Sequence, residues 1–327
     1  MKAIESAQRG SINESFLEFF EMHGQSAKQS EGWLEFGAAR VEVRNGIPRF
    51  TPDTGYTDNF ALLRQKHARL QLDSVNGTTD RRDTLLRRTN WPAEYFFDKV
   101  VLECGCGAGP DTEILLSLGA KVLSVDLAGV DAARDNTAGS PAVQFVQASI
   151  DDLPLRRQSF DIVFCHRVLQ HTPQPRRTLS HVLQFVKPNG TVFVHSYSSS
   201  LRQRLRWKYA LLPLTNKLAP QTLYRIIRAY AKPAFYFTSV TGRSRLGRRL
   251  NWIFVPFLNY RHVQKFRGMP EETLLEYAVH DTFDALSPRF DRPSSVSAMR
   301  SIASSVLRRP FEVVDDGTVT LLRTVLC

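Results

Sequence analysis

The stretch from Lys99 to Asp126, KVVLECGCGAGPDTEILLSLGAKVLSVD, constrains the fold more than any other part of this chain. It begins with a short apolar run at 100–102, which is typical of a strand buried on both faces of a parallel sheet. Three glycines follow at alternate positions, Gly105, Gly107 and Gly109. Because glycine has no Cβ, the backbone can turn tightly there and come close to a ligand. The stretch therefore predicts a strand that leads into a ligand-binding turn.

A second strand and an acid complete the pattern. Residues 121–125 predict another buried strand, and Asp126 stands at its carboxyl end. In open α/β sheets ligands bind at that end, and an acid there commonly holds ribose hydroxyls. A glycine-rich loop by itself can be a plain tight turn, but the succession of strand, loop, helix, strand and acid favours a nucleoside ligand. The dinucleotide fingerprint G-x-G-x-x-G is not met, since Pro110 or Thr112 stands where its third glycine would fall.

The segment ECGCGAG, which starts at Glu103, resembles motif I of the class I S-adenosylmethionine-dependent methyltransferases. The similarity extends over about residues 99–197 and includes QASIDDLPLRRQSFDIVFCHRVLQHTPQPRRTLSHVLQFVKPNGTVFVHSYS. The flanking pieces DNFALLRQKHARLQLDSVNG and HDTFDALSPRFDRP resemble a bacterial branch called methyltransferase type 11. The resemblance implies S-adenosyl-L-methionine as cofactor and methyl transfer as chemistry. It does not specify the acceptor.

Strands and helices alternate along the middle of the chain. Strands are predicted at 100–103, 121–125, 142–147, 160–165 and 191–196, helices at 110–118, near 129–136 and near 174–186, and a turn at 187–190. This alternation predicts an α/β fold with a doubly wound, Rossmann-like parallel sheet. Near the C-terminus, Asp315-Asp316-Gly317 between β-branched runs predicts a hairpin. Class I methyltransferases use a terminal hairpin to place an antiparallel strand in the sheet.

We divide the chain into four parts, an N-terminal appendage at 1–58, the cofactor-binding core at 59–200, a basic helical insertion at 201–285 and a C-terminal helix and β-hairpin at 286–327. The appendage is predicted to be partly helical at ESFLEFFEMHG and then to form a small β element closed by Asn45-Gly46. The methyltransferase branch often carries a zinc ribbon there, but this chain lacks its cysteines, and no second cysteine pair accompanies Cys104 and Cys106. We therefore expect no metal site.

The start of the chain shows no charged and then apolar signal peptide, and the longest apolar run, 252–258, is too short to span a membrane. We therefore expect a cytoplasmic enzyme that can associate with a membrane through its basic insertion.

The resemblance assigns cofactor contacts residue by residue. Glu103, Gly105 and Gly107 would surround the amino-acid end of the cofactor, Asp126 would accept its ribose hydroxyls, and Leu127 would lie beside the adenine. Relatives usually carry an acid after the third strand, where this chain has Ser149-Ile150, so the adenine contacts depart from the family pattern. His166, after the fourth strand, is predicted to pack on the cofactor.

Two histidines are candidates for chemistry at the acceptor. Methyl transfer needs alignment of the acceptor with the methyl group, and a base only where the acceptor must lose a proton. His171 follows the fourth strand and is the first candidate for that base, because histidine titrates near neutrality. His195, together with Tyr197, follows the fifth strand and could face the acceptor. The structural alternatives are a histidine that orders a loop and strand-end residues that cap the sheet.

The insertion concentrates the positive charge of the chain. Between Leu201 and Pro270 there are 15 Lys or Arg, 12 aromatic residues and no Asp or Glu, whereas the whole chain has a net charge of +11. Basic amphipathic helices of this composition bind anionic membrane surfaces or phosphorylated ligands. A solvated basic surface is the simpler alternative. Asp281 and Asp284 are predicted to close the acceptor pocket from the other side or to balance arginines.

These observations predict an S-adenosylmethionine-dependent O-methyltransferase acting on a small-molecule, glycan or lipid-linked acceptor. One alternative is a nucleic-acid methyltransferase, since basic and aromatic residues also bind single strands. Amino-methylating enzymes usually carry D/N-P-P-Y/F after the fourth strand, where this chain has Cys165-His166-Arg167-Val168. The other alternative is a catalytically inactive binding protein that keeps the fold.

Overall fold

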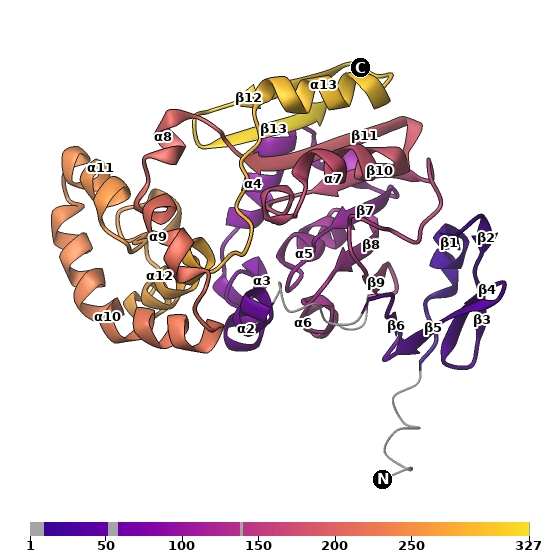
Figure 1. Ribbon diagram of the computed structural model, residues 1–327, viewed down its shortest axis with the longest axis horizontal. Coiled ribbons are helices and arrows are strands. Elements are labelled where there is room, and N and C mark those ends of the chain that lie inside the picture. The colour runs from indigo at the N-terminus through magenta and orange to yellow at the C-terminus, as the bar shows by residue number, and fades with distance from the viewer. Residues whose placement is uncertain (1–9, 52–57, 138–139, 327) are drawn as a thin grey trace, which may run out of the picture.

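The computed structural model describes residues 10–51, 58–137 and 140–326 (Figure 1). A seven-stranded sheet forms its centre, made of β7 (Val100–Cys104), β8 (Lys121–Asp126), β9 (Val143–Gln147), β10 (Phe160–Cys165), β11 (Val186–Tyr197), β12 (Phe311–Asp315) and β13 (Val319–Thr324). The strand order is β12-β13-β11-β10-β7-β8-β9, and the pairs between β7, β8, β9, β10 and β11 are parallel. Strand β13 lies between β11 and β12 and is antiparallel to both. The doubly wound α/β sheet and its terminal antiparallel hairpin are therefore confirmed.

The turn predicted at 187–190 is wrong, because these residues belong to β11. Val186 pairs with Phe160 of β10, and the next pair is Thr191 with Ile162. Residues 187–190 of β11 therefore face a single residue of β10 and form a bulge within the strand. Pro188 has no N–H to donate to a ladder, which accounts for an interruption of pairing at this point. The turn-like sequence thus marks a bulge.

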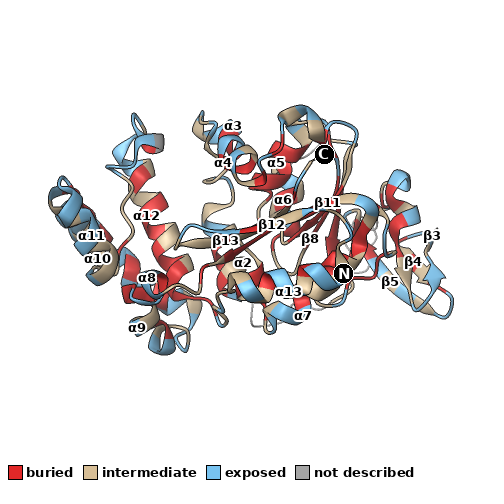
Figure 2. Cartoon of the chain, turned by 90° about the horizontal axis from the view of Figure 1, so that it is seen from above, coloured by how far each residue is buried: buried red, intermediate tan, exposed pale blue. Residues whose placement is uncertain are grey.

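Helices cover both faces of the sheet, whose inner strands are largely buried (Figure 2). One face packs against α4 (Asp80–Thr89) and α5 (Pro110–Ser117) through Leu85 and Leu115, which join a buried cluster with Val101 and Phe164. The other face packs against α7 (Pro175–Val182) and α13 (Val296–Val306). Along β7, Val101 belongs to one cluster and Leu102 to the other, as the alternation of side chains in a strand requires.

The N-terminal region is mostly β structure. The helix expected in ESFLEFFEMHG is limited to a short 3-10 helix, η2 (Glu14–Phe19), because the chain then turns into the hairpin of β1 (Glu21–Met22) and β2 (Gln25–Ser26). A four-stranded sheet follows, made of β3 (Lys28–Ser30), β4 (Trp33–Phe36), β5 (Ala39–Arg44) and β6 (Ile47–Pro48). The turn at Asn45-Gly46 joins β5 to β6 as predicted.

This region docks on the edge of the central sheet. Arg49 forms a parallel bridge with Gln147 of β9, and the backbone N–H of Phe50 donates to the Gln147 carbonyl. Phe16 and Phe20 lie in the same buried cluster as Leu123 of β8. The appendage therefore covers the outer edge of β9. Without this cover, the unpaired backbone groups of the edge strand could pair with another chain.

The basic insertion is helical, as expected. It contains α8 (Leu201–Arg204), α9 (Trp207–Thr215), α10 (Pro220–Thr241), α11 (Arg245–Phe254), the short η6 (Gln264–Phe266) and most of α12 (Glu271–Leu286). These helices lie beside the sheet in Figure 1. Of them, α9, α10, η6 and α12 share a separate apolar cluster with Leu62 and Leu63 of α2 (Asp58–His67). The short α3 (Asp73–Asn76) and α6 (Val130–Asn136) complete the part of the fold that concerns the site. Of the helices in the described ranges, none has the length and apolar character that crossing a bilayer requires.

Candidate functional site

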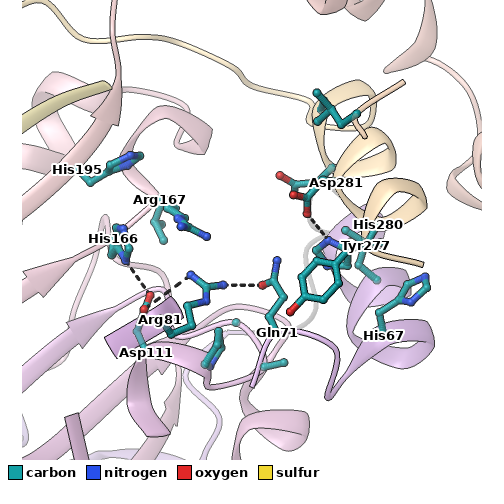
Figure 3. A pocket seen from close by; sticks show the side chains of 18 of the residues that line it. His67, Gln71, Arg81, Asp111, His166, Arg167, His195, Tyr277, His280 and Asp281 are labelled. Atoms are coloured by element: carbon teal, nitrogen blue, oxygen red, sulfur yellow. Dashed lines mark hydrogen bonds and ion pairs between the residues drawn. The ribbon is translucent and has the colours of Figure 1, made fainter. Parts of the chain in front are cut away.

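A cavity of about 410 Å³ lies where the carboxyl ends of β7, β10 and β11 meet α2, α4 and the basic insertion. Its lining includes five of the predicted site residues, Gly105, Gly107, His166, His171 and His195. Asp281 and Asp284 line it from α12, and their closing of an acceptor pocket stays a prediction. Figure 3 shows the two walls of this cavity, with His166 and His195 on the side of the sheet and Asp281 opposite. The topology therefore brings together residues that are more than 100 positions apart in the sequence.

The glycine loop leaves no room for larger side chains. Gly105 has φ +84°, and a Cβ built on it would lie 2.3 Å from Cγ2 of Val168. Gly107 has φ +58°, and its Cβ would lie 2.6 Å from a terminal nitrogen of Arg64. Both positions combine a left-handed backbone with close contact, which only glycine accepts without strain. The loop thus presents bare backbone to the cavity, as the sequence predicts.

Arg64, on α2, was missed by the sequence analysis. Its guanidinium lies against Gly107, its terminal Nη1 donates to the Phe60 carbonyl, and its buried Nε has no hydrogen-bond partner among the described residues. A cation with an unsatisfied donor beside a bare glycine backbone suits the carboxylate of an amino-acid group. The residues present therefore fit the methionine end of S-adenosylmethionine.

Asp126 lies at the carboxyl end of β8, as predicted, and organises the surrounding loops. One carboxylate oxygen accepts from the Gly107 N–H at 2.9 Å, and the other accepts from the N–H groups of Ala128 and Gly129, each at 2.9 Å. The side chain therefore fixes the glycine loop to the turn after β8. Its contact with ribose hydroxyls stays a prediction.

Glu103 is buried beneath the loop. One of its oxygens accepts from the hydroxyls of Thr112 at 2.6 Å and Ser124 at 2.7 Å. Burial is the main cause that raises the pKa of Glu103 to about 7, and the two hydroxyls oppose that shift. This carboxyl group is not among the cavity-lining residues, so in this structure it supports the loop from behind.

The residues predicted to hold adenine lie apart from this cavity. Leu127, Ser149 and Ile150 follow β8 and β9, and none of the three is among the residues that line it. The Ser149 hydroxyl accepts from the Asp151 N–H at 3.2 Å, and Ile150 is buried. Their contact with the cofactor also stays a prediction.

His166 is held in one tautomer by its neighbours. Arg88 can only donate, so the 2.7 Å contact of its Nη1 makes Nε2 of His166 the acceptor. Nδ1 of His166 then carries the proton and donates to Asp111 at 2.9 Å. Burial, with the nearby Arg167 and Arg88 charges, lowers the pKa of His166 to about 3 despite Asp111. His166 is thus a neutral, fully engaged group and not a base.

His171 has the geometry of a base. Its Nδ1 lies 3.1 Å from the Phe290 carbonyl, which can only accept, so Nδ1 carries the proton. Nε2 then keeps a lone pair, which has no hydrogen-bond partner among the described residues. The ring contacts Phe60 and Tyr197 at centroid distances of 5.4 and 5.7 Å and lines the cavity. A loop-ordering bond and a free basic nitrogen therefore coexist in this residue.

His195 is less suited to take a proton. It is buried, and its Nδ1 has no hydrogen-bond partner among the described residues. Burial, followed by the charge of Arg88, holds its pKa well below the ordinary value. The ring lies 5.2 Å from that of His166. We therefore assign His195 to the wall of the site rather than to proton transfer.

The sequence analysis missed the arginines of the sheet-side wall. Arg81 and Arg88 belong to α4, and Arg167 follows β10. Their positions in polar, arginine-rich segments look like solvated surface, because the burial of α4 against α5 depends on the tertiary fold. Arg81 and Arg88 are seven positions apart, a spacing that places both on one face of a helix. This spacing was the one feature of the sequence that could have indicated a shared role for them.

Comparison with known proteins shows similarity over the central part of the chain. The family model described as a methyltransferase domain matches residues 102–194, which run from β7 to β11. The chain is 30% identical over 164 residues to the mitochondrial ubiquinone biosynthesis O-methyltransferase of Schizosaccharomyces pombe, covering 48% of this chain and 56% of that protein. It is 27% identical over 185 residues to the ubiquinone biosynthesis O-methyltransferase of Erwinia tasmaniensis, covering 54% of this chain and 69% of that protein.

A solved structure, that of magnesium protoporphyrin IX methyltransferase from Synechocystis PCC 6803 with bound SAH, aligns over 84% of this chain and 96% of its own. The TM-score is 0.43 and the sequence identity 13%. The alignment with the S. pombe relative spans little more than half the length of that protein.

Proposed function

We propose that this chain, whose residues 102–194 form a class I S-adenosylmethionine-dependent methyltransferase domain, methylates an oxygen atom of a small phenolic acceptor. The observation that carries the proposal is the single cavity onto which both the bare glycine loop and the free Nε2 of His171 open. Methyl transfer requires that a methyl donor and an acceptor meet in one enclosed space. When bound, S-adenosylmethionine supplies a methyl group on a positively charged sulfur.

The chain's own residues would hold that cofactor along the end of the sheet. Gly105 and Gly107 offer the close backbone approach, and Arg64 offers the cation for a carboxylate. Asp126 is the acid for the ribose hydroxyls at the end of β8. Leu127, Ser149 and Ile150 remain the proposed adenine neighbours.

His171 would act on the acceptor. Its Nε2 removes the proton of a phenolic hydroxyl, so the oxygen gains the electron density with which it attacks the methyl group. The Phe290 carbonyl keeps Nδ1 protonated and stabilises the imidazolium that forms. Phe60 and Tyr197, on either side of the imidazole, suit an aromatic acceptor. This arrangement supports an oxygen atom as the methylated position.

The relatives favour the same chemistry. Both are named ubiquinone biosynthesis O-methyltransferases, and we infer from this that a quinone precursor is the acceptor class for this chain too. The wider class expected from the sequence is a small-molecule, glycan or lipid-linked acceptor. Quinone precursors are small molecules, and those that carry a prenyl chain are also lipid-linked.

An assay with tritiated methyl groups tests the proposal. Purified protein is incubated with methyl-labelled S-adenosylmethionine and a catechol acceptor such as 3,4-dihydroxybenzoate, and the labelled product is identified. We expect a labelled methyl ether, and none when both hydroxyls of the acceptor are already methylated. Label found instead on nitrogen, or in RNA added to the same reaction, would overturn the assignment to a phenolic oxygen.

We also propose that the hairpin of α10 and α11 docks on an anionic membrane surface. Helix α11 has no buried residue, and Leu246, Leu250 and Phe254 repeat on it at intervals of four. Leu246 is 67% and Phe254 69% exposed, and Phe237 of α10 is 56% exposed. In Figure 2 both helices are exposed at the edge of the molecule. Unpartnered apolar side chains at helical spacing mark a surface that binds something apolar.

The charge around this apolar surface selects the partner. From Pro220 to Phe254 the chain has seven basic residues and no acid, Arg225, Arg228, Lys232, Arg243, Arg245, Arg248 and Arg249. A cation near an anionic bilayer contributes about 1 kcal/mol. Exposed aliphatic side chains flanked by cations are typical of a helix that binds a lipid surface. A surface for single-stranded nucleic acid instead combines cations with aromatic side chains on which bases stack.

Vesicle sedimentation tests this surface. We expect the protein to pellet with phosphatidylcholine vesicles that contain about 30% phosphatidylglycerol, a lipid content chosen to give a clear surface charge, and not with phosphatidylcholine alone. The double variant Leu246→Ser, Phe254→Ser is expected to weaken binding about 10-fold or more, since each side chain contributes about 1.5–3 kcal/mol when buried. Phe97→Ser, which changes a side chain 72% exposed beside the sheet, is the control. Equal binding of all three proteins, or binding to RNA but not to vesicles, would contradict the proposal.

A further inference from the structure

The sheet-side wall of the cavity carries three guanidinium groups around a single region. Arg81, Arg88 and Arg167 all line the cavity, with the Asp111 carboxylate and the neutral His166 among them. Asp111 accepts from His166, and its other oxygen lies 3.7 Å from Nη1 of Arg81, too far for a hydrogen bond. Like charges repel one another, and the charge of Asp111 offsets only part of the repulsion that Arg167 exerts on Arg81 and Arg88. Their burial and mutual repulsion lower the pKa of both Arg81 and Arg88, the latter to about 9.

Two of these arginines have unsatisfied donors. Arg81 is 6% exposed, its Nη2 donates to Gln71 at 2.7 Å, and its Nη1 has no hydrogen-bond partner among the described residues. The side chain of Arg167 makes no hydrogen bond or ion pair within the described part of the chain. Its backbone has φ +65°, a conformation uncommon for a residue with a side chain. In Figure 3 it points into the cavity, between His166 and the opposite wall with Asp281.

On the opposite wall, Asp281 has hydrogen-bond partners of its own, although its charge also acts to raise the pKa of Arg81, and Arg167 is among the groups that lower the pKa of Asp281. Asp281 accepts from the hydroxyl of Tyr260 and from Nδ1 of His280. Buried donors without partners are costly, because they lose water and gain nothing in return. Guanidinium groups match the planar carboxylate and the phosphate group especially well.

We propose that Arg167, together with the free Nη1 of Arg81, binds an anionic group, a carboxylate or a phosphate, that the acceptor carries. This inference rests on the proposed function, because it assigns the anion to the acceptor. The Arg64 guanidinium lies against Gly107 and serves the cofactor's carboxylate, so the two cationic positions divide the cavity between cofactor and acceptor. Binding at the arginine wall would orient the acceptor's remaining ring towards Phe60, His171 and Tyr197.

Thermal unfolding with simple anions tests the site without an acceptor. We expect 20 mM inorganic phosphate to raise the melting temperature of the wild-type protein by about 2 °C or more relative to chloride at equal ionic strength. Phenyl phosphate is expected to bind about fivefold tighter than phosphate, because its ring reaches the aromatic part of the cavity. Arg167→Gln should abolish both effects. This variant should fold, since the Arg167 side chain has no hydrogen bond or ion pair to lose among the described residues.

Arg176→Gln, an exposed charge change on α7, is the matched control and should respond like the wild type. Equal phosphate stabilisation of wild type and Arg167→Gln would overturn the proposed site. Equal affinity for phosphate and phenyl phosphate would assign it to a free inorganic anion instead of an acceptor.

Titration with S-adenosylhomocysteine separates this inference from the proposed function. The dissociation constant of Arg167→Gln for that nucleoside should lie within about twofold of the wild-type value. Such a change is well below the tenfold change that corresponds to about 1.4 kcal/mol of binding free energy. If Arg167→Gln lost nucleoside affinity and phosphate competed with the nucleoside, the wall would hold the cofactor's carboxylate and the inference would fail. If wild type failed to bind the nucleoside but kept the phosphate effect, the proposed function would fail and the anion site would stand.

Discussion

Asp126→Ala is expected to weaken the binding of S-adenosylhomocysteine by about 100-fold or more. Two hydrogen bonds from ribose hydroxyls to a carboxylate contribute about 1.5–3 kcal/mol each, and the variant loses both. It also loses the anchor that holds the N–H groups of Gly107, Ala128 and Gly129 in place. Isothermal titration calorimetry with the nucleoside measures the loss.

Asp98→Ala is the control for this variant. Asp98 is an exposed carboxylate paired with Lys121 just before the sheet begins at β7, so its removal changes the net charge equally and leaves the loops intact. We expect Asp98→Ala to bind the nucleoside as wild type does. An Asp126→Ala protein with unchanged affinity would show that the acid after β8 does not hold the cofactor.

His171→Asn is expected to lower kcat for methyl transfer about 10²–10⁴-fold, the usual contribution of a positioned base. Asparagine can still donate to the Phe290 carbonyl, so the loop contact that Nδ1 makes is kept while the basic nitrogen is lost. Affinity for S-adenosylhomocysteine should stay within about twofold of wild type, since His171 serves the acceptor and not the cofactor.

The matched control is His23→Asn, at an exposed turn with φ +52° between β1 and β2, where asparagine is well tolerated. Its kcat should equal that of wild type. If His171→Asn kept full activity, proximity alone would drive the transfer, and the assignment of His171 as base would be withdrawn.

Local patterns were enough to predict the central sheet. The apolar runs of β7, β8 and β10 are buried on both faces, and such runs indicate parallel strands without further information. The Asp-Asp-Gly turn predicted the terminal hairpin from its own chemistry. The bulge in β11 was missed because turn-forming residues fit a bulge as well as a turn. The short 3-10 helix η2 was missed because apolar residues at helical spacing do not show how long a helix is.

The site could be predicted only in part. Gly105 and Gly107 follow from the sequence because their role depends on backbone conformation, which a local motif determines. The arginine wall depends on α4 packing against α5, and the tautomer of His171 depends on Phe290, which lies 119 positions later. No local pattern carries such contacts, so the acceptor side of the cavity became visible only in the folded chain.

The most direct test of the central claim is thermal unfolding of the wild-type protein with S-adenosylhomocysteine and, separately, with NAD. We expect S-adenosylhomocysteine at 100 times its dissociation constant to add about 2.7 kcal/mol to the free energy of unfolding, and NAD to add nothing. That result would place a sulfur nucleoside at the glycine loop. Stabilisation by NAD, or by neither ligand at millimolar concentration, would contradict the account of this chain as a methyltransferase.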